Sequence, residues 1–419
     1  MINWIGMPAH NRWMETEMDR IFEFGRRAKT PNGSGWISNT GGLRVEQGTQ
    51  LWLTARKIHV FSAASLLGRP GATTMAIHGI KALTDGLLRD RVNGGWYAVV
   101  ANEGDEIMDP KKEAYAHAFV ALAAASATAA DMPGASELMD LIVDVINKHF
   151  WSEKDGKCMD NWDETFTKCD DYRGGNANMH FVEAFLALHD VTHDDVWLDR
   201  AISIATFMIH EVAAPNNYRV NEHFDKHWTR LPDYNKDNPN DGQRAYGSTP
   251  GHWVEWARLL MHIRATLMAE KKTVPDWLLT DAEGLFHAAI RDAWSKDGAP
   301  GFMYSVDWND GTPTNRHRIR WVAVEAIGSA YAMYESTGKQ EYADYYREFW
   351  DYCRDYLIDY ENGSWLQELD ENNEVSTLVW NGKQDVYHLL HCLLVPRLPL
   401  TPAIVPALKA GLLDKITRA

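Results

Sequence analysis

The chain has 419 residues, enough for two or three average domains, although barrels of repeated helices also reach this length as one unit. Its net charge of −16 argues against nucleic acid or an anionic membrane as the main partner, because phosphate binding requires clustered Lys and Arg. A content of 45% hydrophobic and 24% charged residues excludes disorder and indicates a globular protein with a large core.

Helical periodicity occurs in six pairs along the chain. The first helix of each pair is expected at residues 9–28, 70–90, 132–150, 195–213, 276–294 and 340–358. The second is expected at 48–67, 110–130, 176–190, 250–268, 319–336 and 383–396. Turn-rich segments lie between them, and Asn-Gly or Asp-Gly beside alternating apolar residues predicts that several are short β-hairpins: 30–39, 92–100, 155–162, 215–224, 297–308 and 361–369.

The two sets of helices differ in polarity. The first set carries charged faces, as in EYADYYREFWDYCRDYL, which suits an outer layer with one wet side. The second set is apolar around its circumference, as in AYAHAFVALAAASATAA, which suits an inner layer. The sequence therefore predicts an all-α (α/α)6 barrel of twelve helices, with short β-hairpins in the loops. No Pro/Gly/Ser linker interrupts residues 1–419, so a single domain is expected. An open helical solenoid is the alternative, because periodicity does not show closure.

The stretch STPGHWVEWARLL opens the fourth inner helix, with Ser248 or Thr249 available as a cap and Pro250 suited to the first turn. His252 and Glu255 then lie on one helix face. Other inner helices also begin with polar or aromatic residues, and a closed ring would gather all of these into one cup: Trp52 and Arg56; Tyr115 and His117; Asn176, Asn178, His180 and Glu183; Trp321 and Glu325; Gln384, His388 and His391.

Each of these residues also has a purely structural interpretation. A single histidine on an inner helix is usually a core residue, but the convergence of His180, His252 and His388 from separate helices favours a site. Arg56 lies among apolar neighbours, so it either pairs with a carboxylate such as Glu46 or anchors a ligand. Each tryptophan, taken singly, is more often a core residue than a surface on which a sugar stacks. Trp52 and Trp321 are the best candidates for stacking against a sugar. The charged run at 111–113 is interpreted as a solvated face.

Metal and cofactor signals are weak. His180 with Glu183, and His252 with Glu255, could each chelate from one helix face, but neither forms HExxH and no cysteine joins them. We expect instead that Glu255 orients His252 for proton chemistry. The absence of a P-loop, GxGxxG or GxSxG pattern predicts no nucleotide cofactor and no serine nucleophile.

Several strings along nearly the whole chain resemble the aldose–ketose isomerases of the N-acylglucosamine 2-epimerase superfamily, particularly the mannose and sulfoquinovose isomerases: HNRWMETEMDRIFEFG, GTQLWLTARKIHVFS, YRGGNANMH, VNEHFDKHW, LPDYNKDNP, STPGHWVEWARLL and GKQDVYHLLHCLLVPRLPL. The resemblance implies an (α/α)6 barrel that needs no metal or cofactor. It also implies conversion of D-mannose to D-fructose, or of D-lyxose to D-xylulose, through a cis-enediol with proton transfer between C2 and C1.

The resemblance assigns His252 and His388 to the acid/base pair. It places sugar-binding or supporting groups at Trp52, Arg56, Tyr115, Asn176, His180, Glu255, Trp321, Glu325 and Gln384. The sulfosugar enzymes carry an additional arginine in the loop before STPGHW, where this chain has Gly242, with only Arg244 beyond it. A sulfonate prefers charge-assisted donors, so neutral sugars are favoured.

Four other functions stay open at this stage. Two belong to the same scaffold: a sulfoquinovose isomerase, and a 2-epimerase that reprotonates C2 from the opposite face. The others are an inverting glycoside hydrolase using Glu255 and Glu325, and a sugar-binding protein without catalysis. A monosaccharide is the expected partner, without nucleic acid or membrane, and the oligomeric state is open, a homo-oligomer included. Four cysteines without a CxxC pair, and no secretory signal, predict a cytoplasmic protein.

Overall fold

The computed structural model describes residues 2–415 and is built from two sets of helices. The outer set comprises α1 (Pro8–Arg26), α3 (Ala72–Thr84), α5 (Ala135–Val145), α7 (Asp195–Ala205), α9 (Trp277–Asp292) and α11 (Gln340–Tyr352). The inner set comprises α2 (Leu51–Leu66), α4 (Ala114–Ala129), α6 (Gly175–Thr192), α8 (Pro250–Ala269), α10 (Arg320–Thr337) and α12 (Tyr387–Leu394). All twelve predicted helices are present, and a short unpredicted one, α13 (Ile404–Lys409), follows them.

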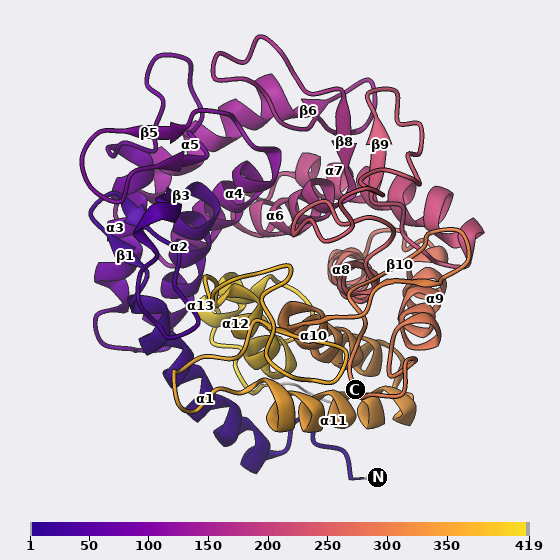
Figure 1. Ribbon diagram of the computed structural model, residues 1–419. Helices are drawn as coiled ribbons and strands as arrows, with labels where there is room; N and C mark the ends of the chain where they lie inside the picture. The colour runs from indigo at the N-terminus through magenta and orange to yellow at the C-terminus, as the bar shows by residue number, and fades with distance from the viewer. Residues whose placement is uncertain (1, 416–419) are drawn as a thin grey trace.

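The inner helices form a closed ring (Figure 1). Each contacts the next, from α2 through α4, α6, α8 and α10 to α12, and α12 contacts α2 again. Five inner helices pack against the outer helix that follows them in the chain, and α12 packs against α1. The predicted (α/α)6 barrel is therefore confirmed, and the open solenoid is wrong.

Sequence pattern explains which helices lie inside. Every residue of α4 from Ala116 to Ala127 is buried, and its many alanines allow neighbouring helices to approach on all sides. In α11 the buried residues follow a three-to-four spacing, with Tyr342, Tyr346 and Phe349 on one stripe and charged residues elsewhere. The outer helices thus bury one face, whereas the inner helices are covered all round.

Shorter helical turns extend or connect these elements. Three outer helices end in π-helical turns, which the predicted helices included as ordinary helix: η2 (Ile146–Phe150), η3 (Thr206–Ala213) and η5 (Cys353–Leu357). Single 3-10 turns occur at η1 (Val45–Gln47), η4 (Ala214–Asn216) and η6 (Val395–Arg397).

The strands are two or three residues long and all pair antiparallel. Local pairs are β1 (Lys29–Thr30) with β2 (Gly33–Ser34), β6 (Trp151–Ser152) with β7 (Lys157–Cys158), and β10 (Ser305–Val306) with β11 (Pro313–Asn315). Pairs between distant segments are β3 (Thr49–Gln50) with β4 (Val99–Val100), β8 (Tyr172–Gly174) with β9 (His223–Asp225), and β12 (Arg318–Ile319) with β13 (Glu368–Leu369). The strand β5 (Ile107–Asp109) joins β4. The predicted hairpins are thus only partly correct, because several turn segments form strands that pair with distant segments of the chain.

Two local predictions are wrong. Ser248 does not cap α8: its hydroxyl donates to the Val220 carbonyl and accepts from the Trp253 indole, while Thr249 makes no side-chain cap. Lys112 is not on a solvated face, since its ammonium is buried 2.7 Å from the Asp90 carboxylate.

Across residues 2–415, no helix combines the length and apolar character that crossing a membrane requires.

Candidate active site

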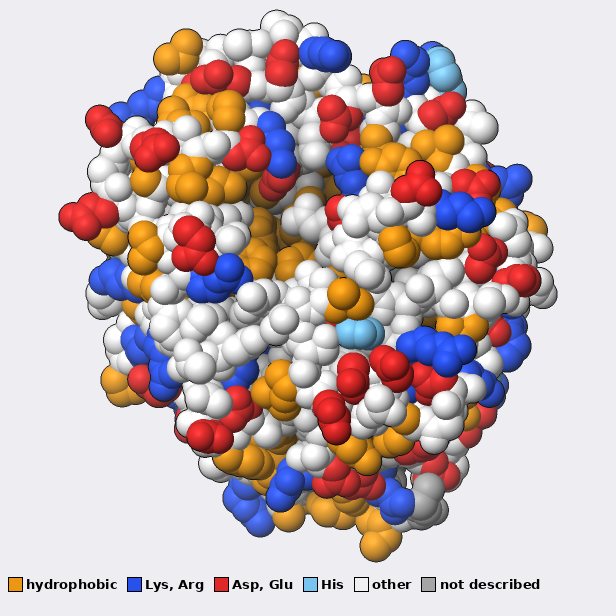
Figure 2. Space-filling view, viewed as in Figure 1, with side chains coloured by type: hydrophobic (Ala, Val, Ile, Leu, Met, Phe, Trp, Pro, Cys, Tyr) orange, Lys and Arg blue, Asp and Glu red, His pale blue; other side chains and the backbone are white. Residues whose placement is uncertain are grey.

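One end of the barrel contains a cavity of about 700 Å³, its open mouth included. The face seen in Figure 1 is hollowed close to the barrel axis (Figure 2). The predicted convergence of the inner-helix starts is confirmed for ten residues that line the cavity: Trp52, Arg56, Tyr115, Asn176, His180, His252, Glu255, Trp321, Gln384 and His388. It is wrong for the other five, which do not line this cavity: His117, Asn178, Glu183, Glu325 and His391. Of these five, Glu183 and His391 line a second cavity.

The imidazoles of His252 and His388 lie against the same indole. The ring of Trp321 is centred 5.0 Å from the His252 ring and 5.7 Å from the His388 ring. Trp321 is the second residue of α10, which lies between α8 and α12 in the ring of inner helices. A ligand beside this indole can therefore reach both imidazoles.

His388 is held by a buried carboxylate. The His388 Nδ1 lies 2.7 Å from Glu325 Oε1, and Glu325 is 1% exposed. Glu325 does not line the cavity, so its position is that of a supporting group and not of a sugar contact. Burial, reinforced by the Arg56 charge, lowers the pKa of His388 well below its usual value. With Nδ1 donating to Glu325, the neutral ring has a lone pair on Nε2 and can accept a proton.

His252 is held by a carboxylate that we did not predict. Its Nδ1 lies 2.9 Å from Glu222 Oε2, and the Thr249 amide donates to the other oxygen of Glu222. Glu222 directly precedes β9, whose pairing with β8 brings it to the mouth of the barrel. The prediction that Glu255 orients His252 is wrong. The Glu255 carboxylate instead accepts from Arg258, one turn further along α8, at 3.4 Å.

Arg56 is both paired and cavity-lining. Its guanidinium lies 2.9 Å from Asp385 Oδ2 and donates to the Tyr115 hydroxyl at 2.8 Å. The suggested partner Glu46 is wrong, since Glu46 lies in the surface turn η1 and pairs with Arg44. Arg56 thus presents a charge-compensated guanidinium and a fixed tyrosine hydroxyl to the cavity.

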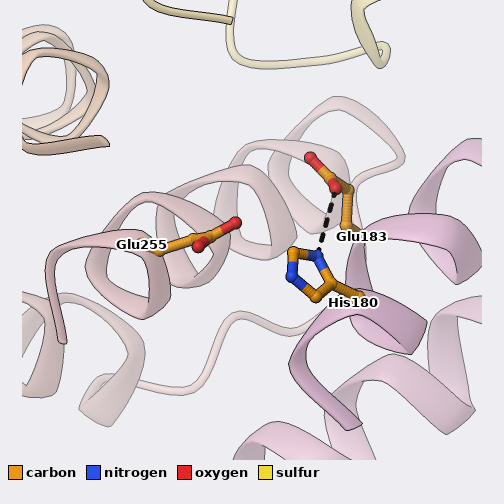
Figure 3. Close-up of side chains that lie close together, drawn as sticks. All are labelled: His180, Glu183 and Glu255. Atoms are coloured by element: carbon orange, nitrogen blue, oxygen red, sulfur yellow. Dashed lines mark ion pairs between the residues drawn. The ribbon is translucent and has the colours of Figure 1, made fainter. Parts of the chain in front are cut away.

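A cluster of charged side chains, called the floor below, adjoins the cavity; among its members Glu255 lines this cavity, whereas Arg258 and Glu183 line a second one. Arg258 lies within 2.9 Å of Glu325, 3.4 Å of Glu255 and 3.7 Å of Glu183. Figure 3 shows Glu255 of α8 pointing toward His180 and Glu183 of α6. The His180 Nδ1 and the Glu183 Oε2 lie 3.8 Å apart. The floor therefore places three carboxylates around one guanidinium.

Several buried polar atoms of cavity-lining residues have no hydrogen-bond partner among residues 2–415. The oxygens are Asn176 Oδ1, Glu255 Oε2, Gln367 Oε1 and Gln384 Oε1, and the nitrogens are Arg56 Nε, His180 Nδ1, Arg320 Nε and Trp380 Nε1. Buried polar atoms are normally hydrogen-bonded, so unpartnered ones on several sides of a cavity indicate a polar ligand or water that completes them. A ligand with many hydroxyl groups would satisfy such a set.

Three groups of side chains bring potential metal-ligating atoms together among residues 2–415: His180, Glu183 and Glu255; Glu255, Glu325 and His388; and His189, Asp195 and Glu270. The carboxylates of the first two groups already share Arg258. Those of the third contact Lys272. Each group thus has a competing cation, and independence from metal stays a prediction.

Comparison with known proteins places this site in a family. A family model described as N-acylglucosamine 2-epimerase (GlcNAc 2-epimerase) matches residues 33–392. The chain belongs to the N-acylglucosamine 2-epimerase family.

Within the N-acylglucosamine 2-epimerase family, this member is similar to enzymes named D-mannose isomerase. It is 44% identical over 410 residues to the one from Pseudomonas cannabina pv. alisalensis, covering 98% of both chains. It is also 44% identical over 415 residues to the one from Thermobifida fusca, covering 97% of this chain and 99% of that one. A crystal structure of a D-mannose isomerase superposes with a TM-score of 0.83 at 27% identity, covering 94% and 98% of the two chains. The protein is therefore an enzyme of a sugar epimerase and isomerase family.

Eleven cavity residues, which come from loops, strands and the first residue of α10, were not predicted from the sequence: Glu222, His223, Gly242, Gln243, Ala245, Thr249, Tyr304, Arg320, Gln367, Trp380 and Asp385. Glu222 and Asp385 lie inside the strings VNEHFDKHW and GKQDVYHLLH, which already carried the resemblance. Helix periodicity cannot show that they reach the cavity, because strand pairing and the loop before α12 place them there.

Replacing Glu222 by Gln tests the positioning of His252. We expect kcat of the enzyme to fall by about 10- to 100-fold, the equivalent of one hydrogen bond to a charged group, with KM little changed. The matched control is Glu270→Gln, which removes another carboxylate bonded to a histidine, His189 at 2.6 Å, outside the cavity. Equal kcat values for the two variants would contradict the role of Glu222.

Proposed function

We propose that this enzyme interconverts D-mannose and D-fructose, and D-lyxose and D-xylulose, through a cis-enediol intermediate. The observation that carries this proposal is the pair of imidazoles, each with Nδ1 on a buried carboxylate, against Trp321 in one cavity. We further infer that residues 1–419 act as one catalytic domain on a free monosaccharide in the cytoplasm. The relatives named D-mannose isomerase support the choice of sugar.

The surroundings of the two histidines support a different role for each. His252 assists opening of the pyranose ring by moving a proton from O1 to the ring oxygen. His388 Nε2 then takes the proton from C2 and returns it to C1, while His252 moves a proton between O1 and O2. No proton is gained or lost overall, so no cofactor is needed. Trp321 offers its indole to the apolar face of the sugar, and the unpartnered Asn176 and Gln384 oxygens accept from hydroxyl groups.

The loop before α8 favours a neutral substrate. Arg244 is turned to the Asp160 carboxylate at 3.2 Å and lies over the Tyr172 ring, and it does not line the main cavity. A Cβ on Gly242 would meet the Trp380 ring at 2.7 Å, so a longer residue there would displace this ring from the cavity wall. Both features argue against a sulfonated sugar.

The glycoside hydrolase is disfavoured by the positions of its two proposed carboxylates. Both Glu255 and Glu325 contact Arg258, and only Glu255 lines the cavity. An inverting hydrolase needs its acid and base on opposite sides of the sugar, with room for water beside the base. The two carboxylates do not offer that arrangement.

The test is to incubate the purified enzyme with D-mannose and EDTA, without added cofactor, and to identify the products by chromatography. D-fructose is the expected product. D-glucose would instead support a 2-epimerase. Unchanged D-mannose, or activity that requires a metal, would contradict the proposal.

A further inference from the structure

The charge balance of the cavity floor is uneven. Glu183, Glu255 and Glu325 surround Arg258, and each of the four side chains is at least nine-tenths buried. A second guanidinium that acts on Glu255, that of Arg56, is already paired with Asp385. One cation among three buried carboxylates leaves excess negative charge, which is expensive away from water unless a proton neutralises part of it.

The hydrogen bonds stabilise the three carboxylates to different extents. Glu325 accepts from His388 at 2.7 Å and from Arg258 at 2.9 Å. Glu183 accepts from the Tyr387 hydroxyl and lies 3.5 Å from His391. Within the described part of the chain, Glu255 has only the longer Arg258 contact at 3.4 Å on Oε1, and its Oε2 has no hydrogen-bond partner. As an anion, Glu255 would be the least stabilised of the three.

We propose that Glu255 carries a proton in the resting enzyme and donates a hydrogen bond through Oε2 to the sugar oxygen that gains negative charge as the enediol forms. The proposal rests on the isomerase function above and makes Glu255 a catalytic residue. The proton stays on Glu255 throughout, so the transfer from C2 to C1 keeps its balance. A neutral donor stabilises a developing oxyanion, whereas a carboxylate at the same place would repel it.

The groups around Glu255 agree with this assignment. Burial, followed by the Glu325 carboxylate, raises the pKa of Glu255 well above its usual value. His180, opposite Glu255 in Figure 3, has a pKa lowered to about 4 by burial and so adds no positive charge near neutral pH. The ionisable groups facing Glu255 from the packed helices are Arg56 of α2, Tyr115 of α4, His180 and Glu183 of α6, Arg258 of α8, Glu325 of α10, and Tyr387 and His388 of α12.

The first test is infrared spectroscopy of the full-length protein near neutral pH. The wild type should show the carbonyl stretching band of a protonated carboxylic acid, shifted in deuterated water, and E255Q should lack it. A difference spectrum without such a band would overturn the proposal. This readout needs no turnover, so it decides the protonation of Glu255 even if the enzyme does not isomerise D-mannose.

The second test compares Glu255→Gln with Glu325→Gln. A glutamine amide replaces a protonated carboxyl as donor, so E255Q should lose no more than about 10-fold in kcat/KM, whereas E325Q and E255A should each lose about 10²-fold or more. The wild-type kcat/KM should fall at alkaline pH as Glu255 loses its proton, and this limb should be missing in E255Q. A loss in E255Q as large as in E325Q would overturn the proposal.

Discussion

Replacing His388 by Asn is expected to lower kcat for D-mannose by about 10³- to 10⁴-fold, the upper range for removal of a general base. The variant keeps a polar side chain near Glu325 but loses the Nε2 lone pair that we propose takes the C2 proton. The measurement is fructose formation under saturating D-mannose, with circular dichroism to show that the helices remain.

His262→Asn is the matched control for this variant. His262 is a histidine of inner helix α8 whose Nδ1 lies 2.5 Å from the Leu400 carbonyl, in a second cavity away from His252 and His388. Its replacement is expected to leave kcat near the wild-type value. A His388→Asn variant that kept more than about a tenth of wild-type kcat would contradict general-base catalysis by His388.

Replacing Arg258 by Met is expected to lower the free energy of unfolding by about 3–5 kcal/mol, because it leaves Glu183, Glu255 and Glu325 without their shared cation. The arginine is 2% exposed, so water cannot replace it easily. Chemical denaturation followed by circular dichroism measures the change.

The pH dependence of that loss has a defined sign. Without the guanidinium, the pKa values of the buried carboxylates rise in the folded protein above their unfolded values, so stability falls as the pH rises through the folded values. Arg258→Met should therefore be less destabilised at pH 5 than at pH 8. The control Lys148→Met breaks an exposed pair with Asp144 and should cost less than about 1 kcal/mol. An equal effect of both substitutions would contradict the account of the floor.

The fold could be predicted from the sequence because each helix carries its own signal. The apolar circumference of α4 and the single buried stripe of α11 separate inner from outer helices without any knowledge of contacts. The start of α8, where His252 and Glu255 share one face, likewise indicated the mouth of the barrel. Closure could only be inferred, since the contact between α12 and α2 joins opposite ends of the chain.

The carboxylates that hold the histidines could not be assigned from spacing. Glu255 lies three residues from His252, yet Glu222, thirty positions earlier, makes the bond, because β8 and β9 bring that segment to α8. Glu325 and His388 come from adjacent helices, so no periodicity links them. Arg56 likewise pairs with Asp385, which lies 329 positions away. Such pairs depend on tertiary packing and become visible only when the barrel is closed.

We propose above that two imidazoles acting on one monosaccharide move a proton from C2 to C1. Nuclear magnetic resonance of the products formed from D-mannose in deuterated water tests it most directly. We expect D-fructose with deuterium at C1, because the proton held on His388 exchanges with the solvent that reaches the open cavity. D-fructose formed without any deuterium at C1, as a direct hydride shift would give, would contradict the mechanism.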